Sequence, residues 1–323
     1  MFQLHTDLII DNIENNKNII KNTIKEKEIK ITKVKLKNNI ENKKKGNYIT
    51  IEFKDATDSY NRENLKNIFI KYLKEILKKN KIKPEDKCLV IGLGNRESTP
   101  DSLGPKTLNN ILVTNHLFDL ENVDKNYRRV SIFEPSVTGK TGIETSELIK
   151  TISNNYDFII VIDALASKSI DRLNKTIQMT DTGIHPGSGI GNTRKEISYE
   201  TIKKRVIAIG IPTVVDAVTI VTDTIKYLYQ KYSYTKENIN KPSNRLTYGN
   251  RDYKNNIEIN ENIKKEIFGL IGTLNEDEIQ QLFYEVLTPI GYNMMVTTKE
   301  IDYQIEILSK VIGEGINKSL HKI

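Results

Sequence analysis

Two aspartates follow directly on apolar runs that are typical of buried β-strands. Asp163 ends the run FIIVID at residues 158–163, and Asp101 lies in the loop that follows CLVIGLG at residues 88–94. Open α/β sheets bind their substrates at the carboxyl ends of the strands, so the two carboxylates face each other if the strands are neighbours. Two close carboxylates do not ionise together easily, and one pKa then rises while the other stays low. Such a pair can supply the general acid and the general base for hydrolysis of a peptide bond by water.

Each aspartate also has a purely structural interpretation. The segment TPDS at residues 99–102 can start a helix, with Thr99 as its cap and Asp101 in its first turn, where an acidic side chain suits the helix dipole. Asp163 can cap a helix that begins with ALASKSI. A carboxylate at the end of a strongly apolar strand is costly to bury without a partner, which favours a functional role for Asp163.

The sequence offers little for the other common chemistries of α/β proteins. The dinucleotide-binding fingerprint requires a third glycine three positions after Gly94, where this chain has Glu97. No Walker lysine follows, so no nucleotide cofactor is expected, and Gly92 and Gly94 are interpreted as a sharp exit from the strand. The four histidines show no HExxH or HxH spacing, so a dedicated catalytic zinc is not expected. There is no GxSxG motif, and Cys88, which opens a buried strand, is interpreted as inert.

A glycine-rich loop, DTGIHPGSGIGNTRKE, spans residues 181–196. It contains too many glycines for a packing element, and we expect it to approach a substrate backbone or another subunit. His185 within it is interpreted either as a loop-stabilising residue or as a metal ligand or acid/base group. The residues predicted to support the site or to line a substrate loop are Asn95, Glu144, Asp181, His185, Gly187 and Gly189.

Short apolar runs with little alternation predict the strands that position these side chains. They lie at residues 88–94, 130–133, 158–163, 176–180 and 205–212. Strands that are buried on both faces of a sheet have this composition. Helical segments at about 103–115, 143–153 and 216–231 lie between several of them. The alternation predicts an α/β fold, with a three-layer, mostly parallel sheet and helices on both faces.

The flanking regions have different patterns. Residues 29–36 and 47–53 alternate apolar and polar side chains around the turn ENKKKG, which predicts an antiparallel hairpin at one edge of the sheet. Residues 61–79 repeat apolar side chains at helical spacing. Residues 232–262 are polar and predict a surface insertion. Two C-terminal segments, EDEIQQLFYEVL and EIDYQIEILSKVIGEGI, predict helices that pack back on the sheet, and one domain over residues 8–323 is expected.

Composition and charge argue against several classes of protein. No apolar run in the 323 residues approaches the roughly 18 residues of a membrane span. The N-terminus lacks the pattern of a secretion signal, and a single cysteine is consistent with a reducing cytosol. The net charge of +7 lies within residues 1–86, which hold 20 basic and 13 acidic residues. Because this region has no arginine cluster and no interleaved aromatic residues, a solvated lysine-rich face is favoured over a nucleic-acid surface.

Several long blocks resemble the germination proteases of spore-forming bacteria. They include TPDSLGP, IDALASKSIDRLN, TIQMTDTGIHPGSGIGNTRKE, IGIPTVVDAVTI and YEVLTPIGYNMMVTTKEID, and they cover most of residues 88–232 and 268–320. The resemblance implies an endopeptidase that degrades small acid-soluble spore proteins during germination, in the cytoplasm of the spore core. It also implies a homotetramer without a cofactor, and a fold related to that of hydrogenase-maturation proteases. The implied mechanism is an atypical aspartic one with Asp101 and Asp163 as the catalytic residues, and neither a membrane nor nucleic acid is an expected partner.

The resemblance further implies a zymogen that trims its own N-terminus. The stretch HTDLII at residues 5–10 is similar to the processing region of the family, whose cleavage favours an acidic residue followed by an apolar one. Asp7–Leu8 is therefore the candidate self-cleavage bond, and residues 1–7 form the expected pro-segment. A pro-segment of this length is short for the family.

Two other functions stay open from the sequence. The first keeps the fold but makes the protein a metal-dependent maturation-type peptidase, with an ion held by Asp101, Asp163 and His185. The second is a non-enzymatic, basic DNA-associated protein that acts through residues 17–83, where the lysines concentrate.

Overall fold

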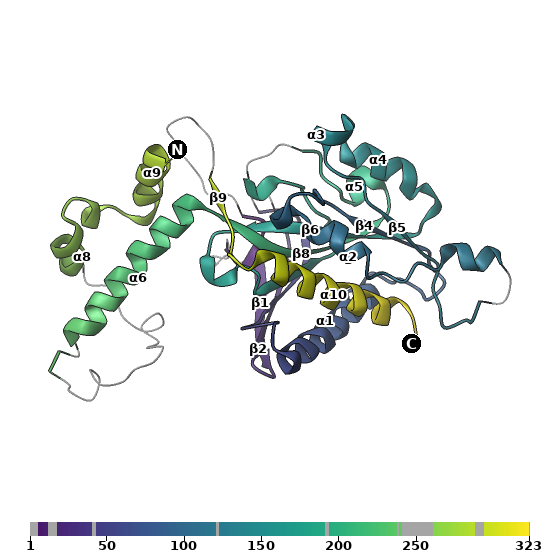
Figure 1. The fold of residues 1–323 in the computed structure, drawn as a ribbon, viewed down its shortest axis with the longest axis horizontal. Helices are drawn as coiled ribbons and strands as arrows, with labels where there is room; N and C mark the ends of the chain where they lie inside the picture. Colours follow the sequence, from purple (N-terminus) through teal and green to yellow (C-terminus); the bar gives the residue numbers. More distant parts are fainter. Residues whose placement is uncertain are drawn as a thin grey trace. The chain divides into compact units, whose positions relative to one another are not determined.

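The computed structural model describes residues 6–11, 18–40, 43–120, 123–190, 194–237, 239–240, 261–287 and 294–322. A single mixed sheet forms the centre of the fold, with the strand order β1-β2-β3-β7-β8-β6-β4-β5 (Figure 1). The strands on this path are β1 (Ile19–Glu26), β2 (Ile29–Leu36), β3 (Gly46–Glu52), β4 (Cys88–Gly92), β5 (Val130–Phe133), β6 (Phe158–Ser167), β7 (Thr176–Thr180) and β8 (Arg205–Asp216). Each apolar run that predicted a strand coincides with one of these strands.

The sequence predicts a mostly parallel sheet, and the sheet is mixed: the parallel pairing includes β4 with β5 and with β6. β4 pairs in parallel with β5 on one side and with β6 on the other, so that Cys88 lies opposite both Val130 and Phe158. Every residue of β4 is buried, and β6 is buried along nearly its whole length. Because both faces of these strands are covered, apolar side chains appear at consecutive positions instead of alternating.

The other half of the sheet is antiparallel and extends further than the predicted hairpin. The hairpin of β2 and β3 is confirmed, with Lys30 opposite Glu52 and Leu36 opposite Gly46. β3 continues the antiparallel pairing to β7, and β7 continues it to β8. Outside the hairpin lies β1, whose mostly exposed, polar residues gave no strand signal in the sequence. Lysines along this edge discourage pairing with another chain.

Helices cover both faces of the sheet, which confirms the three-layer α/β class (Figure 1). On one face, α1, α2 and α10 share a core with alternate residues of the strands, such as Val90 and Ile160. On the other face, α4 and α5 contribute Ile149 and Ile202 to a second core around Ile91. The helices of this part of the chain are α1 (Ser59–Lys79), α2 (Leu103–Leu108), α3 (Thr138–Thr141), α4 (Thr145–Ile152), α5 (Tyr199–Ile202) and α10 (Ile301–Leu320).

The chain divides into two compact units. The larger unit contains strands β1 to β7, β8 as far as Val214, and the helices on both faces of this sheet. The smaller holds Lys168–Ile170 and Val215–Val296. Its helices are α6 (Ala217–Glu237), α8 (Glu261–Phe268) and α9 (Glu276–Leu287), and its strand β9 (Met295–Val296) pairs with the last two residues of β8.

The two predicted C-terminal helices form, but they pack in different places. α10 lies in the core with α1 and the sheet, as predicted, whereas α9 packs against α6 inside the smaller unit. In the same unit the rings of Tyr229 and Phe268 meet edge to face at 5.1 Å. The predicted surface insertion begins as helix, because α6 continues to Glu237, and its residues 238 and 241–260 lie outside the described residues. No helix among the described residues has the length and apolar character needed to cross a membrane.

Candidate active site

Asp101 and Asp163 lie at the carboxyl ends of two neighbouring parallel strands. β4 ends at Gly92, which is opposite Ile162, so Asp163 is the first residue of β6 beyond the stretch that pairs with β4. Asp101 is the last residue of a short 3-10 turn, Thr99–Asp101, in the loop that follows β4. β6 continues through Asp163 to Ser167, which rules out the interpretation of Asp163 as a helix cap. Asp101 does lie in a helical turn, so its structural interpretation is compatible with its place beside Asp163.

A glycine allows the loop to bring Asp101 back to the strand end. Gly94 has a φ of 109°, a conformation that side chains rarely adopt, and a Cβ there would lie 3.0 Å from the Asp101 carboxylate. The backbone N–H of Asn95, the next residue, donates to a carboxylate oxygen of Asp101 at 2.8 Å. The predicted role as a sharp strand exit fits Gly94, whereas Gly92 is still part of β4 and has no positive φ. Asn95 contributes through its backbone.

The two carboxyl groups are electrostatically coupled. Asp163 is 6% exposed, and burial raises its pKa well above the ordinary range, with further increases from the charges of Asp101 and Asp7. Burial also raises the pKa of Asp101, although the hydrogen bond from the Asn95 N–H opposes this shift. The positive charge of Arg194 lowers both pKa values. Because Asp163 is more deeply buried than Asp101, and Asp101 accepts a hydrogen bond from the Asn95 N–H, the pair favours a proton on Asp163 and a negative charge on Asp101.

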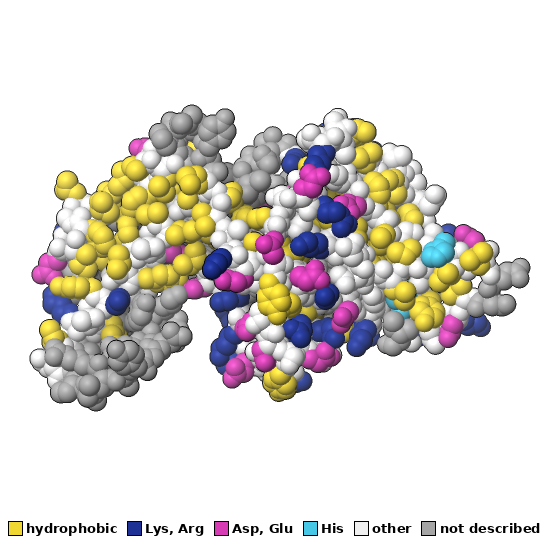
Figure 2. Space-filling model, viewed as in Figure 1, with side chains coloured by type: hydrophobic (Ala, Val, Ile, Leu, Met, Phe, Trp, Pro, Cys, Tyr) yellow, Lys and Arg dark blue, Asp and Glu magenta, His cyan; other side chains and the backbone are white. Residues whose placement is uncertain are grey.

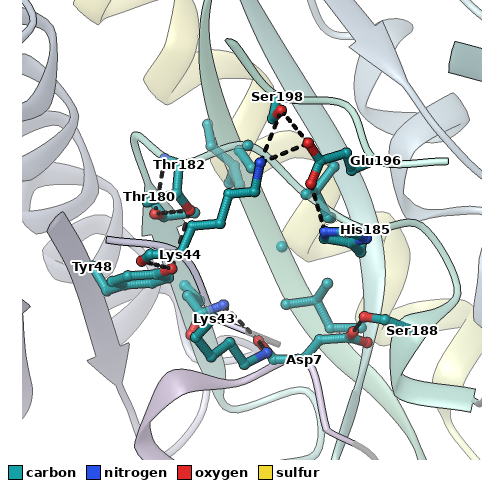
Figure 3. A pocket seen from close by; sticks show the side chains of 17 residues that line it. Asp7, Lys43, Lys44, Tyr48, Thr180, Thr182, His185, Ser188, Glu196 and Ser198 are labelled. Atoms are coloured by element: carbon teal, nitrogen blue, oxygen red, sulfur yellow. Dashed lines mark hydrogen bonds and ion pairs between the residues drawn. The ribbon is translucent and has the colours of Figure 1, made fainter. Parts of the chain in front are cut away.

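Asp7 is seated against β6, close to this pair. Its backbone N–H donates to the carbonyl oxygen of Ala166 at 3.1 Å. Its carboxylate accepts hydrogen bonds from the Ala166 N–H at 2.9 Å and from the Ser188 hydroxyl at 2.6 Å. Gly189 faces the carboxylate, and a Cβ there would lie only 2.7 Å from the Asp7 Cγ. These groups form a carboxylate pocket, which we define as Ala166, Ser188 and Gly189 (Figure 3 shows Asp7 and Ser188).

The main chain after Asp7 is held as closely as its side chain. The carbonyl oxygen of Asp7 accepts from Lys43 Nζ at 2.8 Å and from Gln178 Nε2 at 3.0 Å. The N–H of Ile9 donates to Gln178 Oε1 at 2.7 Å, and Leu8 between them is fully buried. The candidate processing bond, Asp7–Leu8, therefore lies in a fixed position in the larger unit.

A cavity beside Asp7 has charged walls (Figure 3). Lys44 Nζ contacts Glu196 at 2.6 Å, Glu200 at 2.8 Å and the Ser198 hydroxyl at 3.2 Å. His185 Nε2 lies 2.8 Å from the second oxygen of Glu196. His185 is thus part of the cavity wall through Glu196. In the part of the chain that the structure describes, no three His, Cys, Asp or Glu side chains lie together as a metal site would require.

The remaining predicted residues are dispersed. Asp181 accepts from the backbone N–H and the side-chain amide of Asn47, at 2.8 and 2.7 Å, and so ties the start of β3 to the end of β7. Glu144 precedes the first residue of α4, and its Oε1 is buried without a hydrogen-bond partner among the described residues. Gly187 adopts a φ of 73° next to Ser188. Cys88 is fully buried in β4, where burial raises the pKa of its thiol, as expected of an inert cysteine.

Sequence reasoning missed four residues that contact Asp7. Lys43 belongs to a run of three lysines that resembles an ordinary exposed turn, and Ser188 lies between two glycines. Ala166 contributes only backbone groups. Gln178 gave the one available signal, because it is a polar residue in the middle of the buried run TIQMT, and buried polar groups require partners.

The whole chain resembles one family of known proteins. The model of the germination protease family (Peptidase_A25) matches residues 5–323. The germination protease of Priestia megaterium is 47% identical over 291 residues, which cover 86% of this chain and 79% of that protein. That of Bacillus subtilis is 44% identical over 292 residues, covering 87% and 79%. That of Bacillus pumilus is 43% identical over 350 residues, covering 99% and 94%.

A comparison of structures gives a more distant similarity. The [NiFe] hydrogenase maturation protease HycI from Thermococcus kodakarensis is 13% identical, with a TM-score of 0.27, covering 44% of this chain and 80% of that one. The sequence relationships are much stronger and extend over both units. On these grounds the chain belongs to the germination protease family and is a protease.

Proposed function

We propose that the protein is an endopeptidase that hydrolyses small acid-soluble spore proteins during germination, with a water molecule activated by Asp101 and Asp163. The observation that carries this proposal is the pair of carboxyl groups at the ends of β4 and β6, whose pKa values are both raised by burial. Membership of the germination protease family supports a protein substrate. A carboxyl pair of this kind can divide the roles of acid and base without a cofactor.

The deep burial of Asp163 and the hydrogen bond that Asp101 accepts from the Asn95 N–H support one division of roles within the pair. Asp101, ionised, takes a proton from water while the water oxygen attacks the carbonyl carbon of the scissile bond. Asp163, protonated, donates a hydrogen bond to the carbonyl oxygen as negative charge develops there. When the tetrahedral intermediate breaks down, the proton held by Asp101 passes to the leaving nitrogen, and both carboxyl groups return to their starting states.

The same site serves self-processing of a zymogen in this proposal. The candidate bond Asp7–Leu8 follows an acidic residue that occupies the carboxylate pocket, and it precedes a buried leucine. Residues 1–7 are then the pro-segment, which fills the site until its own cleavage. Neutral donors hold the Asp7 carboxylate, so the pocket accepts an acidic side chain without an ion pair.

We further propose a homotetramer in the cytoplasm of the spore core. The smaller unit supports self-association, because hydrophobic side chains gather over α6, α8 and α9 in Figure 2. The exposed large hydrophobic residues of the smaller unit include Leu228, Tyr232, Leu270 and Val286. Contiguous apolar surface of this kind is commonly covered in an oligomer. Light scattering on the purified protein measures the mass directly, and a monomer at working concentrations would contradict this part.

Ion pairs reduce the case for a DNA-binding role of the N-terminal region. Lys33 pairs with Glu75 at 2.6 Å, and Lys71 pairs with Glu26 at 2.8 Å. Lys30 pairs with Glu52 at 2.9 Å. These lysines are distributed over β2 and α1 and have acidic partners, which leaves less net charge for counterion release from DNA.

The decisive experiment is incubation with a small acid-soluble spore protein, followed by mass mapping of the cut sites. Wild type and Asp163→Asn are compared side by side. We expect cuts after acidic residues in the wild type and none in the variant. Wild-type cleavage by a folded Asp163→Asn protein would contradict the mechanism, and an intact substrate in both samples would contradict the proposed substrate.

A further inference from the structure

Two side-chain donors converge on the carbonyl oxygen of the candidate scissile bond. Lys43 Nζ and Gln178 Nε2 approach the Asp7 oxygen to 2.8 and 3.0 Å. The lysine comes from the loop before β3 and the glutamine from β7, so two separate parts of the sheet contribute. Donors at about 2.7–3.1 Å from the oxygen that becomes negatively charged are the geometric requirement for an oxyanion hole.

Gln178 contacts the main chain on both sides of that bond. Its Nε2 donates to the Asp7 carbonyl, and its Oε1 accepts from the Ile9 N–H, two residues later. Gln178 is 7% exposed, so the surrounding strand holds its amide in place. Both contacts are to backbone groups, which every peptide substrate has. The amide can therefore orient other sequences as it orients this one.

The neighbouring lysine has a different set of partners. Lys44 contacts Glu196 and Ser198 in the cavity wall, and Glu200 outside it. Lys43 instead directs its ammonium group at the carbonyl oxygens of Thr6 and Asp7, at 3.0 and 2.8 Å. A cation on a peptide carbonyl gains most when that oxygen becomes negative, so the contact strengthens in the transition state.

We propose that Lys43 and Gln178 form the oxyanion hole of the protease, and that Gln178 also fixes the direction of the substrate main chain. This inference rests on the proposed function, because it takes Asp7–Leu8 as a bond that the enzyme cleaves. The developing oxyanion then receives two hydrogen-bond donors, the Lys43 ammonium and the Gln178 amide. The water attacks the carbonyl carbon, the carbonyl π electrons move to oxygen, and the charge on that oxygen is met by the Lys43 ammonium.

The test is self-processing of the full chain, followed by intact-mass spectrometry. Loss of one oxyanion donor typically lowers the rate by about 100- to 1,000-fold, and we expect this for Lys43→Met. Lys45→Met is the matched control, since Lys45 belongs to the same run of lysines and its side chain is exposed. Cleavage of an added peptide that spans residues 1–14 supplies a second readout, in which kcat falls while KM changes little.

Gln178→Glu provides an independent variant of nearly the same size and shape. Its side chain keeps an acceptor for Ile9 but no longer donates to the Asp7 carbonyl, so we expect a loss of similar magnitude. If Lys43 only held the pro-segment in place, Lys43→Met would raise KM for the added peptide and leave kcat unchanged. Processing at or above the wild-type rate in either folded variant overturns the inference.

The proposed function has its own control in the same series. Wild type that cuts Asp7–Leu8, with Asp163→Asn inactive and Lys43→Met unchanged, refutes the oxyanion hole alone. Wild type that never cuts this bond, or Asp163→Asn that cuts it normally, refutes the proposed function itself.

Discussion

The charge of Asp101 raises the pKa of Asp163, because the two carboxyl groups lie at the ends of the adjacent parallel strands β4 and β6. Burial of Asp163 is the larger cause, and Asp101 adds to it. The sheet thus holds one carboxyl group in its neutral form beside another that can ionise. This arrangement leads to separate predictions for activity, for pH dependence and for stability.

Replacing either aspartate by asparagine should remove the activity but not the fold. Asparagine keeps the shape of aspartate but can neither accept a proton from water nor supply one as an acid. A general acid or base typically contributes about 100- to 10,000-fold to the rate. We expect Asp101→Asn and Asp163→Asn each to slow cleavage by a factor in this range or larger. Rates come from gel or mass analysis of substrate cleavage, and circular dichroism checks the fold. Full activity in either variant contradicts the paired mechanism.

The rate of cleavage should depend on pH with both an acid and an alkaline limb. Activity requires ionised Asp101, so it falls as the pH drops through the Asp101 pKa, which lies above the ordinary value of 3.8. It also requires protonated Asp163, so it falls as the pH rises through the Asp163 pKa, which lies well above 3.8. Initial rates measured across the pH range test this profile. The apparent pKa values of the two limbs belong to the coupled pair and not to either residue alone. A cleavage rate that keeps rising into the alkaline range would refute the predicted profile.

Stability should fall with rising pH in a way that depends on Asp163. Its pKa is higher in the folded than in the unfolded protein, so the folded state holds the proton more tightly. The resulting stabilisation is complete below the unfolded pKa of about 3.9 and is lost as the pH rises through the folded pKa. Asp163→Asn does not titrate. The melting temperature of the variant should therefore rise relative to that of the wild type as the pH increases. Each unit by which the folded-state pKa of Asp163 is raised corresponds to about 1.4 kcal/mol of unfolding free energy.

The matched control for this measurement is Asp302→Asn, because Asp302 is exposed in the first turn of α10. Its melting temperature should keep a constant difference from the wild type between about pH 6 and pH 9. A constant difference for Asp163→Asn over the same interval would show that Asp163 is ionised in the folded protein throughout.

A single added methyl group at Gly189 should block the carboxylate pocket. The new Cβ would lie 2.7 Å from the Asp7 Cγ and 2.8 Å from the Ala166 Cβ, so Asp7 has to move. We expect Gly189→Ala to slow self-processing by about 10- to 100-fold, since small misplacements of a reacting group have costs of this order. The measurement is the half-life of the full-length chain by mass spectrometry. Gly139→Ala is the control, because a Cβ at Gly139 meets nothing within 4 Å.

The sequence predicted the parts of the site that depend on strand ends. Asp101 and Asp163 follow apolar runs, and topology alone brings such positions together at one edge of the sheet. Gln178 and Lys43 could not be found this way, because they do not lie at predicted strand ends. Their role depends on contacts with the backbone of residues 6–11, and local sequence patterns do not reveal such contacts. Strand β1 was missed for a related reason. Its residues are mostly exposed at the edge of the sheet, and backbone pairing with β2 holds the strand in place. Because few of its side chains are buried, its sequence shows no alternation of apolar and polar residues.

The larger-scale division of the chain was also outside the reach of local patterns. The segment that forms α9 has the periodicity of a helix with one apolar face, and periodicity does not identify the partner of that face. The structure pairs α9 with α6 in the smaller unit. The same limitation applies to α10: its packing on the sheet was predicted, but its contact with α1 was not.

The seating of Asp7 on Ala166 of its own chain has a kinetic consequence. A bond that is tethered inside the site has a fixed effective concentration, which does not change when the protein is diluted. Maturation would then follow first-order kinetics, and its half-life would be the same in a dilute sample as in a crowded spore. Under the proposed self-processing, Leu8 would become the new N-terminus and Ile9 could stay on Gln178, whereas the released segment would diffuse away. Each molecule would therefore be processed independently of the others, and only once.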